Sequence, residues 1–139
     1  TADIINSDAT IEHLKYPKTF LLNCRSLLAS GGYLLLSTPN LVTLLKRIKF
    51  LFGISPNWPI AEFFSAGESF TGHWREYTQS ELSYICTAVG FKVLQTETRD
   101  VLTPWKRSGF KKNLRALIAR LARLIPSAQE LHYLLAQKS

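Results

Sequence analysis

The stretch DIINSDATIEHLKYPKTFLLNCRSLLASGGYLLLSTPN, residues 3–40, decides how the rest of this sequence is interpreted. It contains two short apolar runs, Asp3–Ser7 and Tyr33–Thr38, which both end in small polar residues. A helix-length segment with Pro17 near its start separates the two runs, and we expect that helix to end at Gly31. Two buried strands joined by a helix form a right-handed βαβ unit in a parallel sheet.

The carboxyl ends of these two predicted strands are the first place to look for function. In parallel sheets, ligands bind in the crevice beyond the carboxyl ends of the strands. Here those ends are Asn6-Ser7-Asp8 and Thr38-Pro39-Asn40, which the βαβ unit brings to the same edge.

Composition indicates one globular domain of 139 residues, with 46% hydrophobic residues. No apolar stretch approaches the ~20 residues that cross a bilayer, and a cytoplasmic location is the expectation. The sequence contains no Met, so we expect it to be part of a longer protein. Cys24 and Cys86 fall on apolar helix faces and are interpreted as buried free thiols.

The net charge of +7 comes largely from two basic clusters. One is Lys46, Arg47 and Lys49, and the other extends over Lys106–Arg123. The second cluster follows one side of an amphipathic helix predicted over Phe110–Ile125. That side could be an ordinary solvated face, could contact an anionic membrane surface, or, less favoured, could contact nucleic-acid phosphates.

Three segments organise the chain, at residues 1–40, 41–72 and 73–139. Residues 53–72 are rich in Pro, Gly and aromatic residues, and we expect a lid or binding loop with little regular structure. Thr78 and Glu81 predict a capping box at the start of a helix that Gly90 ends. Two further strands are predicted, at Phe91–Glu97 and Leu131–Gln137.

Taken together, IEHL, GGYLLLSTPN, GHWREYT, SEL and GF, in this order, resemble the C-terminal half of class I S-adenosylmethionine-dependent methyltransferases. The small-molecule enzymes of ubiquinone biosynthesis are the most similar group. The resemblance implies an α/β fold, namely strands 4-5-7-6 of a Rossmann-like seven-stranded sheet in a three-layer αβα arrangement. Strand 7, at Leu131–Gln137, would be antiparallel.

The resemblance also implies S-adenosylmethionine as cofactor and methyl transfer, preferably to an oxygen, of a small or lipid-linked substrate. Asn6, Ser7 and Asp8 would lie beside the methionine part of that cofactor. The family's glycine-rich cofactor loop has no counterpart in these residues, so we expect them alone to be inactive.

Glu12 and His13 are the candidate catalytic pair. Histidine titrates near neutral pH, so His13 could be a general base, or it could simply pack at a helix start. The resemblance links an E-x-x-E-H pattern to a divalent metal, but Ala9 stands where the first Glu would be. Two ligands make a poor site for a hard cation, and no metal is expected.

The candidate substrate-binding residues come from two loops, and each could instead be structural. They are Thr38, Asn40, His73, Arg75 and Tyr77.

Two other functions fit parts of the sequence. One is a non-catalytic, methyltransferase-like module that binds an anionic membrane surface or a protein partner. The other is a nicotinamide-dependent doubly wound enzyme, which explains the βαβ unit but not GHWREYT. The sequence leaves the oligomeric state and the substrate open.

Overall fold

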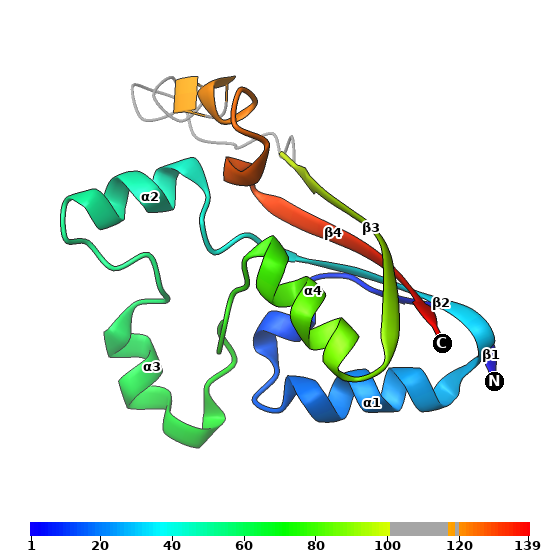
Figure 1. Ribbon diagram of the computed structural model, residues 1–139. Coiled ribbons are helices and arrows are strands. Elements are labelled where there is room, and N and C mark those ends of the chain that lie inside the picture. The colour runs from blue at the N-terminus through cyan, green and yellow to red at the C-terminus, as the bar shows by residue number, and fades with distance from the viewer. Residues whose placement is uncertain (101–116, 119) are drawn as a thin grey trace.

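The computed structural model describes residues 1–100, 117–118 and 120–139, and its centre is a twisted four-stranded sheet (Figure 1). The strand order is β1-β2-β4-β3. β1 and β2 are parallel, whereas β4 is antiparallel to both of its neighbours. This confirms the predicted order 4-5-7-6 with the last strand antiparallel. The strands are β1 (Ala2–Ser7), β2 (Leu28–Pro39), β3 (Phe91–Arg99) and β4 (Leu131–Lys138).

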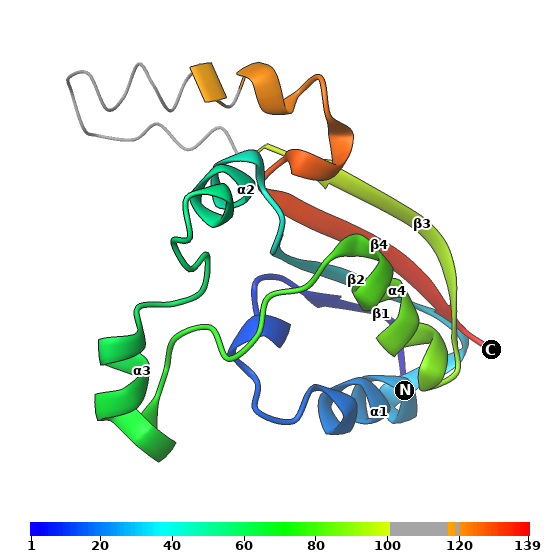
Figure 2. The same cartoon turned by 60° about the vertical axis from the view of Figure 1, so that its left-hand side comes forward.

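Two helices, α1 and α4, lie on the same face of this sheet (Figure 2). The second helical layer of the predicted αβα arrangement is not among the described residues. No helix in the described part of the chain is long and apolar enough to cross a membrane. The helical elements are η1 (Ile11–His13), α1 (Pro17–Leu27), α2 (Leu44–Leu51), α3 (Ile60–Ala66), η2 (Gly67–Ser69), α4 (Gln79–Ala88) and η3 (Pro126–Ala128).

The start of α4 agrees with the prediction from the sequence, whereas the end of α1 does not. At α4, Thr78 accepts a hydrogen bond from the Glu81 backbone while the Glu81 carboxylate accepts one from the Thr78 backbone, which is the predicted capping box. The expected end of α1 at Gly31 is wrong, because the helix ends at Leu27 and Leu28 is already extended. Gly31 instead adopts φ +75° inside β2.

The core lies between the sheet and these two helices. Leu21 and Cys24 of α1 and Leu82 and Cys86 of α4 pack against it from the helical side. From the sheet, it is completed by Leu28, Leu34, Leu36, Phe91, Leu134 and Ala136. Both cysteines are buried free thiols, as expected. Burial raises the pKa of the Cys86 thiol to about 12, which keeps it protonated and unreactive.

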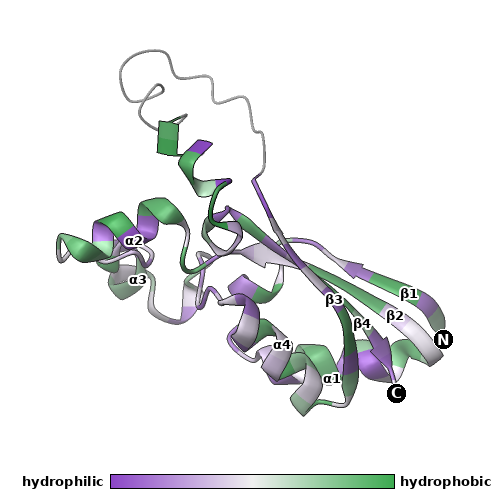
Figure 3. Ribbon diagram, turned by 45° about the horizontal axis from the view of Figure 1, so that its top comes forward, coloured by the Kyte–Doolittle hydropathy of each residue, from purple (hydrophilic) through white to green (hydrophobic). Residues whose placement is uncertain are grey.

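The segment between β2 and α4 lies beyond the carboxyl ends of β1 and β2 (Figure 1). The expectation of little regular structure at residues 53–72 is wrong, because α3 and η2 lie within it. Figure 3 shows apolar residues along both α2 and α3. Half of the predicted basic helix Phe110–Ile125, and most of the stretch Lys106–Arg123, lie outside the described residues.

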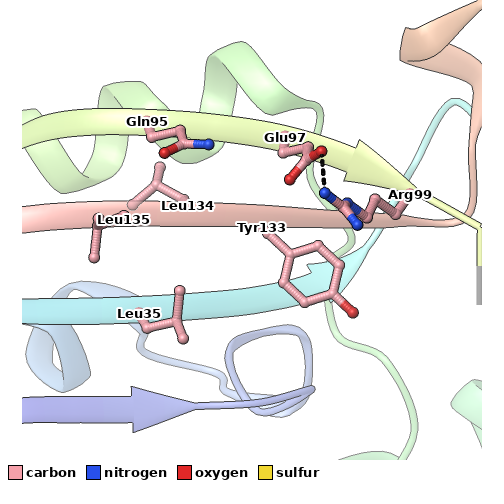
Figure 4. A pocket seen from close by; sticks show the side chains of 7 residues that line it. All are labelled: Leu35, Gln95, Glu97, Arg99, Tyr133, Leu134 and Leu135. Carbon is pink, nitrogen blue, oxygen red and sulfur yellow. Dashed lines mark ion pairs between the residues drawn. The ribbon is translucent and has the colours of Figure 1, made fainter.

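The opposite face of the sheet carries no helix within the described residues, and we call it the bare face (Figure 2). An open hollow of about 420 Å³ lies on it (Figure 4). None of the predicted site residues lines this hollow. Its lining residues are Leu35, Gln95, Glu97, Arg99, Tyr133, Leu134 and Leu135.

Candidate functional site

The end of β1 turns sharply into η1 at the carboxyl edge of the sheet. Ala9 adopts φ +44°, which is rare for a residue with a side chain. Its backbone N–H donates to the carbonyl of Ser37 at 3.1 Å, and the Ser37 hydroxyl donates to the carboxylate of Asp8. These bonds fix the turn against β2 and place η1 over the end of that strand.

The three predicted cofactor-binding residues lie at this turn with different exposures. Asn6 and Asp8 are exposed, whereas Ser7 is buried on the helix-covered face. The Ser7 hydroxyl has no hydrogen-bond partner among the described residues. A buried hydroxyl without a partner is unusual in folded proteins.

Glu12 is fully buried in η1, which is uncommon for a carboxylate. Its Oε2 accepts a hydrogen bond from the Thr38 hydroxyl at 3.0 Å, while Oε1 has no partner within the described chain. Its backbone carbonyl accepts hydrogen bonds from the N–H groups of Trp74 and Arg75, at 2.8 and 3.2 Å. Glu12 therefore joins the end of β2 to the segment that precedes α4.

The same backbone contact brings His73 next to His13. The two imidazole rings are 4.7 Å apart between centroids and nearly perpendicular. The Nδ1 atom of His13 lies 3.0 and 3.2 Å from the carbonyl oxygens of Thr71 and Gly72. The Nδ1 atom of His73 lies 2.9 Å from Oε1 of Glu76. Burial, followed by the influence of His13 and Lys46, lowers the pKa of His73 and favours its neutral form.

Glu12, His13 and His73 thus form one cluster. Each side chain offers a ligand atom, and these three atoms all lie within 4.8 Å of one another. His13 is exposed and His73 is partly buried, so the cluster is open on one side. The sequence predicted Glu12 with His13 but gave no sign that His73, sixty positions further on, would join them.

Aromatic side chains from residues 53–72, together with Trp74, form one side of this cluster. The Trp58 ring lies 5.1 Å from the His73 ring and 6.2 Å from Phe70. Phe63, Phe70 and Trp74 continue the contacts through edge-on pairs at 5.1 to 5.7 Å. Edge-on pairs of this kind stabilise a fixed packing of the rings. Trp74 is thus a packing residue.

The remaining predicted substrate-binding residues are held by structural contacts. Asn40 is fully buried, and its side-chain amide donates to the carbonyls of Ser127 and Gln129. Thr38 is fully buried against Glu12. A direct contact of either residue with substrate stays a prediction.

Arg75 and Tyr77 lie on the chain that leaves the cluster for α4. The exposed Arg75 guanidinium pairs with Glu81 at 2.7 Å and lies 5.8 Å from the Tyr77 ring centroid. Tyr77 is buried, its hydroxyl has no partner in the described residues, and burial raises its pKa. Arg75 is thus the more accessible of the two to a substrate, and its role also stays a prediction.

A half Rossmann-like sheet with a polar cluster at its carboxyl edge defines a class of proteins that bind small molecules at that edge. A family model described as "Methyltransferase domain" matches residues 1–96. The chain therefore belongs to this methyltransferase family, as its sequence motifs suggested.

Three solved structures show the same fold. One is the methyltransferase in a complex with the Trm112 methyltransferase activator from Haloferax volcanii (TM-score 0.60, 11% identity, 99% of this chain, 54% of that chain). Two are S-adenosylmethionine-dependent methyltransferases. The one from Archaeoglobus fulgidus has a TM-score of 0.56 and 17% identity, over 98% of this chain and 59% of that chain. The one from Thermotoga maritima has a TM-score of 0.62 and 15% identity, over 99% of this chain and 56% of that chain. The chain thus spans little more than half the length of these structures. No curated protein sequence matches it.

Proposed function

We propose that this chain forms the C-terminal half of an S-adenosylmethionine-dependent methyltransferase domain that methylates an oxygen of a small or lipid-linked substrate. The observation that carries the proposal is the Ser7 hydroxyl, which has no hydrogen-bond partner among the described residues and is flanked by exposed Asn6 and Asp8 at the end of β1. When bound, the cofactor would supply an electrophilic methyl group on its sulfonium sulfur, and that sulfur would be the leaving group, as a thioether.

The residues at the end of β1 fit a polar ligand of this kind. Ser7 offers a hydroxyl whose hydrogen-bonding capacity is unused within the described residues. Asn6 and Asp8 are exposed and offer an amide and a carboxylate. The Asp8 carboxylate accepts from the Ser37 hydroxyl through one oxygen, and its second oxygen suits a cationic amino group. These three residues would hold the amino-acid part of the cofactor.

His13 is suited to remove the proton from the acceptor hydroxyl. The two carbonyl oxygens near Nδ1 can only accept hydrogen bonds, so Nδ1 carries the hydrogen and Nε2 keeps the lone pair. A carboxylate oxygen of Glu12 lies within 4.8 Å of a ring nitrogen of His13, next to the place where the proton would be taken up. Positioning of the acceptor would fall to His73 and Arg75, beside the aromatic wall.

Calorimetry of the intact protein with S-adenosylmethionine tests cofactor binding. Ser7→Ala removes one hydrogen bond, so we expect the Kd to rise about 3- to 10-fold. Ser30→Ala is the matched control, because Ser30 is exposed near the other end of the sheet and should leave the Kd unchanged. A wild-type protein that gives no heat of binding overturns the proposal.

Transfer of an isotope-labelled methyl group to a panel of small phenols and alcohols tests the chemical step. His13→Gln should lower the turnover number about 10²- to 10⁴-fold with little change in cofactor Kd. His132→Gln, a histidine buried elsewhere on β4, should retain turnover. Equal turnover in His13→Gln and wild type would exclude His13 as the base, whatever the outcome for cofactor binding.

Peripheral contact with an anionic membrane is a second candidate, supported by α2 and α3. Phe50, Leu51 and Phe52 are 72%, 82% and 78% exposed, and they follow the basic residues Arg47 and Lys49. Lys46 of the same cluster is instead paired with Glu76. An apolar surface next to cationic side chains is typical of segments that lie on membranes. Access to a lipid-linked substrate would then accompany membrane contact.

Sedimentation with phosphatidylserine vesicles tests this contact. We expect binding that weakens at high salt and is absent with phosphatidylcholine alone. Leu51→Ser should reduce it, whereas Tyr84→Ser, an equally exposed site on α4, should not. Equal binding by the two variants would exclude α2 as the contact.

A further inference from the structure

The buried carboxylate of Glu12 requires an electrostatic partner that the described residues do not supply. The side chain is fully buried, one oxygen accepts from Thr38, and the other has no partner in the described chain. A charged group taken out of water without pairing is strongly unfavourable. A carboxylate oxygen of Glu12 belongs to the cluster that also contains His13 and His73. A cation in this cluster would satisfy it.

Both histidines are oriented as metal-binding histidines are. Each Nδ1 faces an acceptor, namely two backbone carbonyls for His13 and the Glu76 carboxylate for His73. Each Nδ1 therefore donates, and each Nε2 retains a lone pair. A ligating histidine almost always donates its other nitrogen to a carbonyl or carboxylate, which fixes its tautomer and ring orientation. The two rings belong to segments joined by the backbone bonds from Trp74 and Arg75 to Glu12.

The spacing suits one ion. The three candidate ligand atoms lie within 4.8 Å of one another. Ligands of one zinc ion, at ~2.0–2.1 Å from the metal, are separated by up to about 4 Å. Side-chain rotations that move the three ligand atoms by less than about 1 Å would therefore close the site. The exposed side of His13 leaves a coordination position open to solvent.

We propose that Glu12, His13 and His73 bind a divalent transition-metal ion, with Zn²⁺ as the reference ion. Two imidazoles and one carboxylate favour zinc and its neighbours over Mg²⁺ or Ca²⁺, which prefer all-oxygen sites. The site stands independently of methyl transfer. The expectation of no metal considered Glu12 and His13 alone and did not include His73. A water or substrate hydroxyl in the open position would be acidified by the ion, which would then replace His13 as the activating group.

The experiment is a titration of the chelator-treated intact protein with Zn²⁺, followed by competition with a chromophoric chelator. His73→Asn and Glu12→Gln should each raise the Kd for Zn²⁺ at least about 100-fold. Even the loss of a group that only hydrogen-bonds to a ligand lowers metal affinity about 10- to 100-fold. His132→Asn is the matched control and should keep the wild-type Kd. Visible absorption of the Co²⁺-loaded protein should lose its ligand-field bands in both cluster variants and keep them in the control.

Unfolding and cofactor binding of the same variants complete the test. Without metal, Glu12→Gln should unfold cooperatively in urea, as the wild type does, so weak Zn²⁺ binding by this variant would not reflect misfolding. Equal Zn²⁺ affinity in wild type, His73→Asn and Glu12→Gln would overturn the site as adventitious binding elsewhere. Loss of Zn²⁺ binding with intact S-adenosylmethionine binding would separate this site from the proposed cofactor site.

Discussion

The two faces of the sheet are built from alternate residues of the same strands, yet they differ sharply in exposure. Leu34 and Leu36 of β2 are fully buried under the helices, whereas Leu35 between them is 37% exposed on the bare face. Ile4 of β1 is 64% exposed on that same bare face. The run of leucines in β2 therefore gives no hint of which face is covered. The helices α1 and α4 decide it, because successive strand residues point to opposite faces.

The two faces also differ in their polar residues, which are buried on the helix-covered face and exposed on the bare face. The row that contains Leu34 and Leu36 continues to Thr38, which binds buried Glu12 at the functional edge. The bare face instead carries the ion pair between Glu97 and Arg99 beside the hollow in Figure 4. Ser7 and Glu12 of the candidate site have buried polar atoms without a partner among the described residues, whereas Glu97 and Arg99 of the bare face pair with each other at the surface.

The largest expected difference between the faces is the cost of removing a leucine. Leu34→Ala should lower the free energy of unfolding by about 2–5 kcal/mol, because it leaves a cavity in the core. Leu35→Ala, its neighbour on the bare face, should cost less than half as much. Urea denaturation of both variants measures the difference. Equal losses would mean that the bare face is covered in solution.

A pH dependence specific to the helix-covered face is the second prediction. His132 on β4 lies in the row of Leu134 and Ala136, and burial lowers its pKa from 6.5 to about 4. A backbone hydrogen bond with Tyr77 opposes this shift, and the positive charge of Lys46 adds to it. The unfolded chain takes up the proton near pH 6.5, but the folded chain takes it up only near pH 4. Stability should therefore fall as the pH is lowered from 6.5 to 4, by up to about 3 kcal/mol.

Denaturation at a series of pH values measures this loss, and His132→Asn supplies the control. The variant should be less dependent on pH between 6.5 and 4 than the wild type. An unchanged slope in His132→Asn would assign the pH dependence to groups other than His132.

The sheet order and the capping box of α4 could be predicted because local signals carry them. Thr78 with Glu81 is a local hydrogen-bond exchange, and apolar runs bounded by glycine and proline indicate strands. The end of α1 could not be predicted, because Leu27 and Leu28 continue an apolar pattern that suits both helix and strand. The pattern does not show that Leu28 pairs with Ala2 of β1.

The candidate site was predictable only in part, for a similar reason. Glu12 and His13 are adjacent in sequence and follow a strand, so their place at the sheet edge followed from topology. The approach of His73 depends on backbone bonds from Trp74 and Arg75 to Glu12, which no spacing in the sequence encodes. Likewise, α3 begins after Pro59 in a segment whose aromatic residues pack together only in the folded chain.

The cap of α4 provides a smaller test of the covered face, because it anchors one of the two covering helices. Thr78→Ala should lower the free energy of unfolding by about 1 kcal/mol, since the N–H of Glu81 loses its acceptor. Thr87→Ala, an exposed position within the same helix, should be neutral or slightly stabilising, because alanine favours helix. Chemical denaturation compares the two. An equal loss in both would indicate that helix propensity, and not the cap, limits the stability of α4.

The smallest expected effect lies on the bare face, at the ion pair between Glu97 and Arg99. Their nitrogen and oxygen atoms are 2.7 Å apart, but the two side chains are 42% and 66% exposed. Water screens such a pair, and ordering two long side chains offsets most of its attraction. Arg99→Gln should therefore leave the urea midpoint unchanged within error at both low and high salt. A clear loss at low salt would mean that the pair is shielded from solvent, which is possible only if another part of the protein or a partner lies over this face.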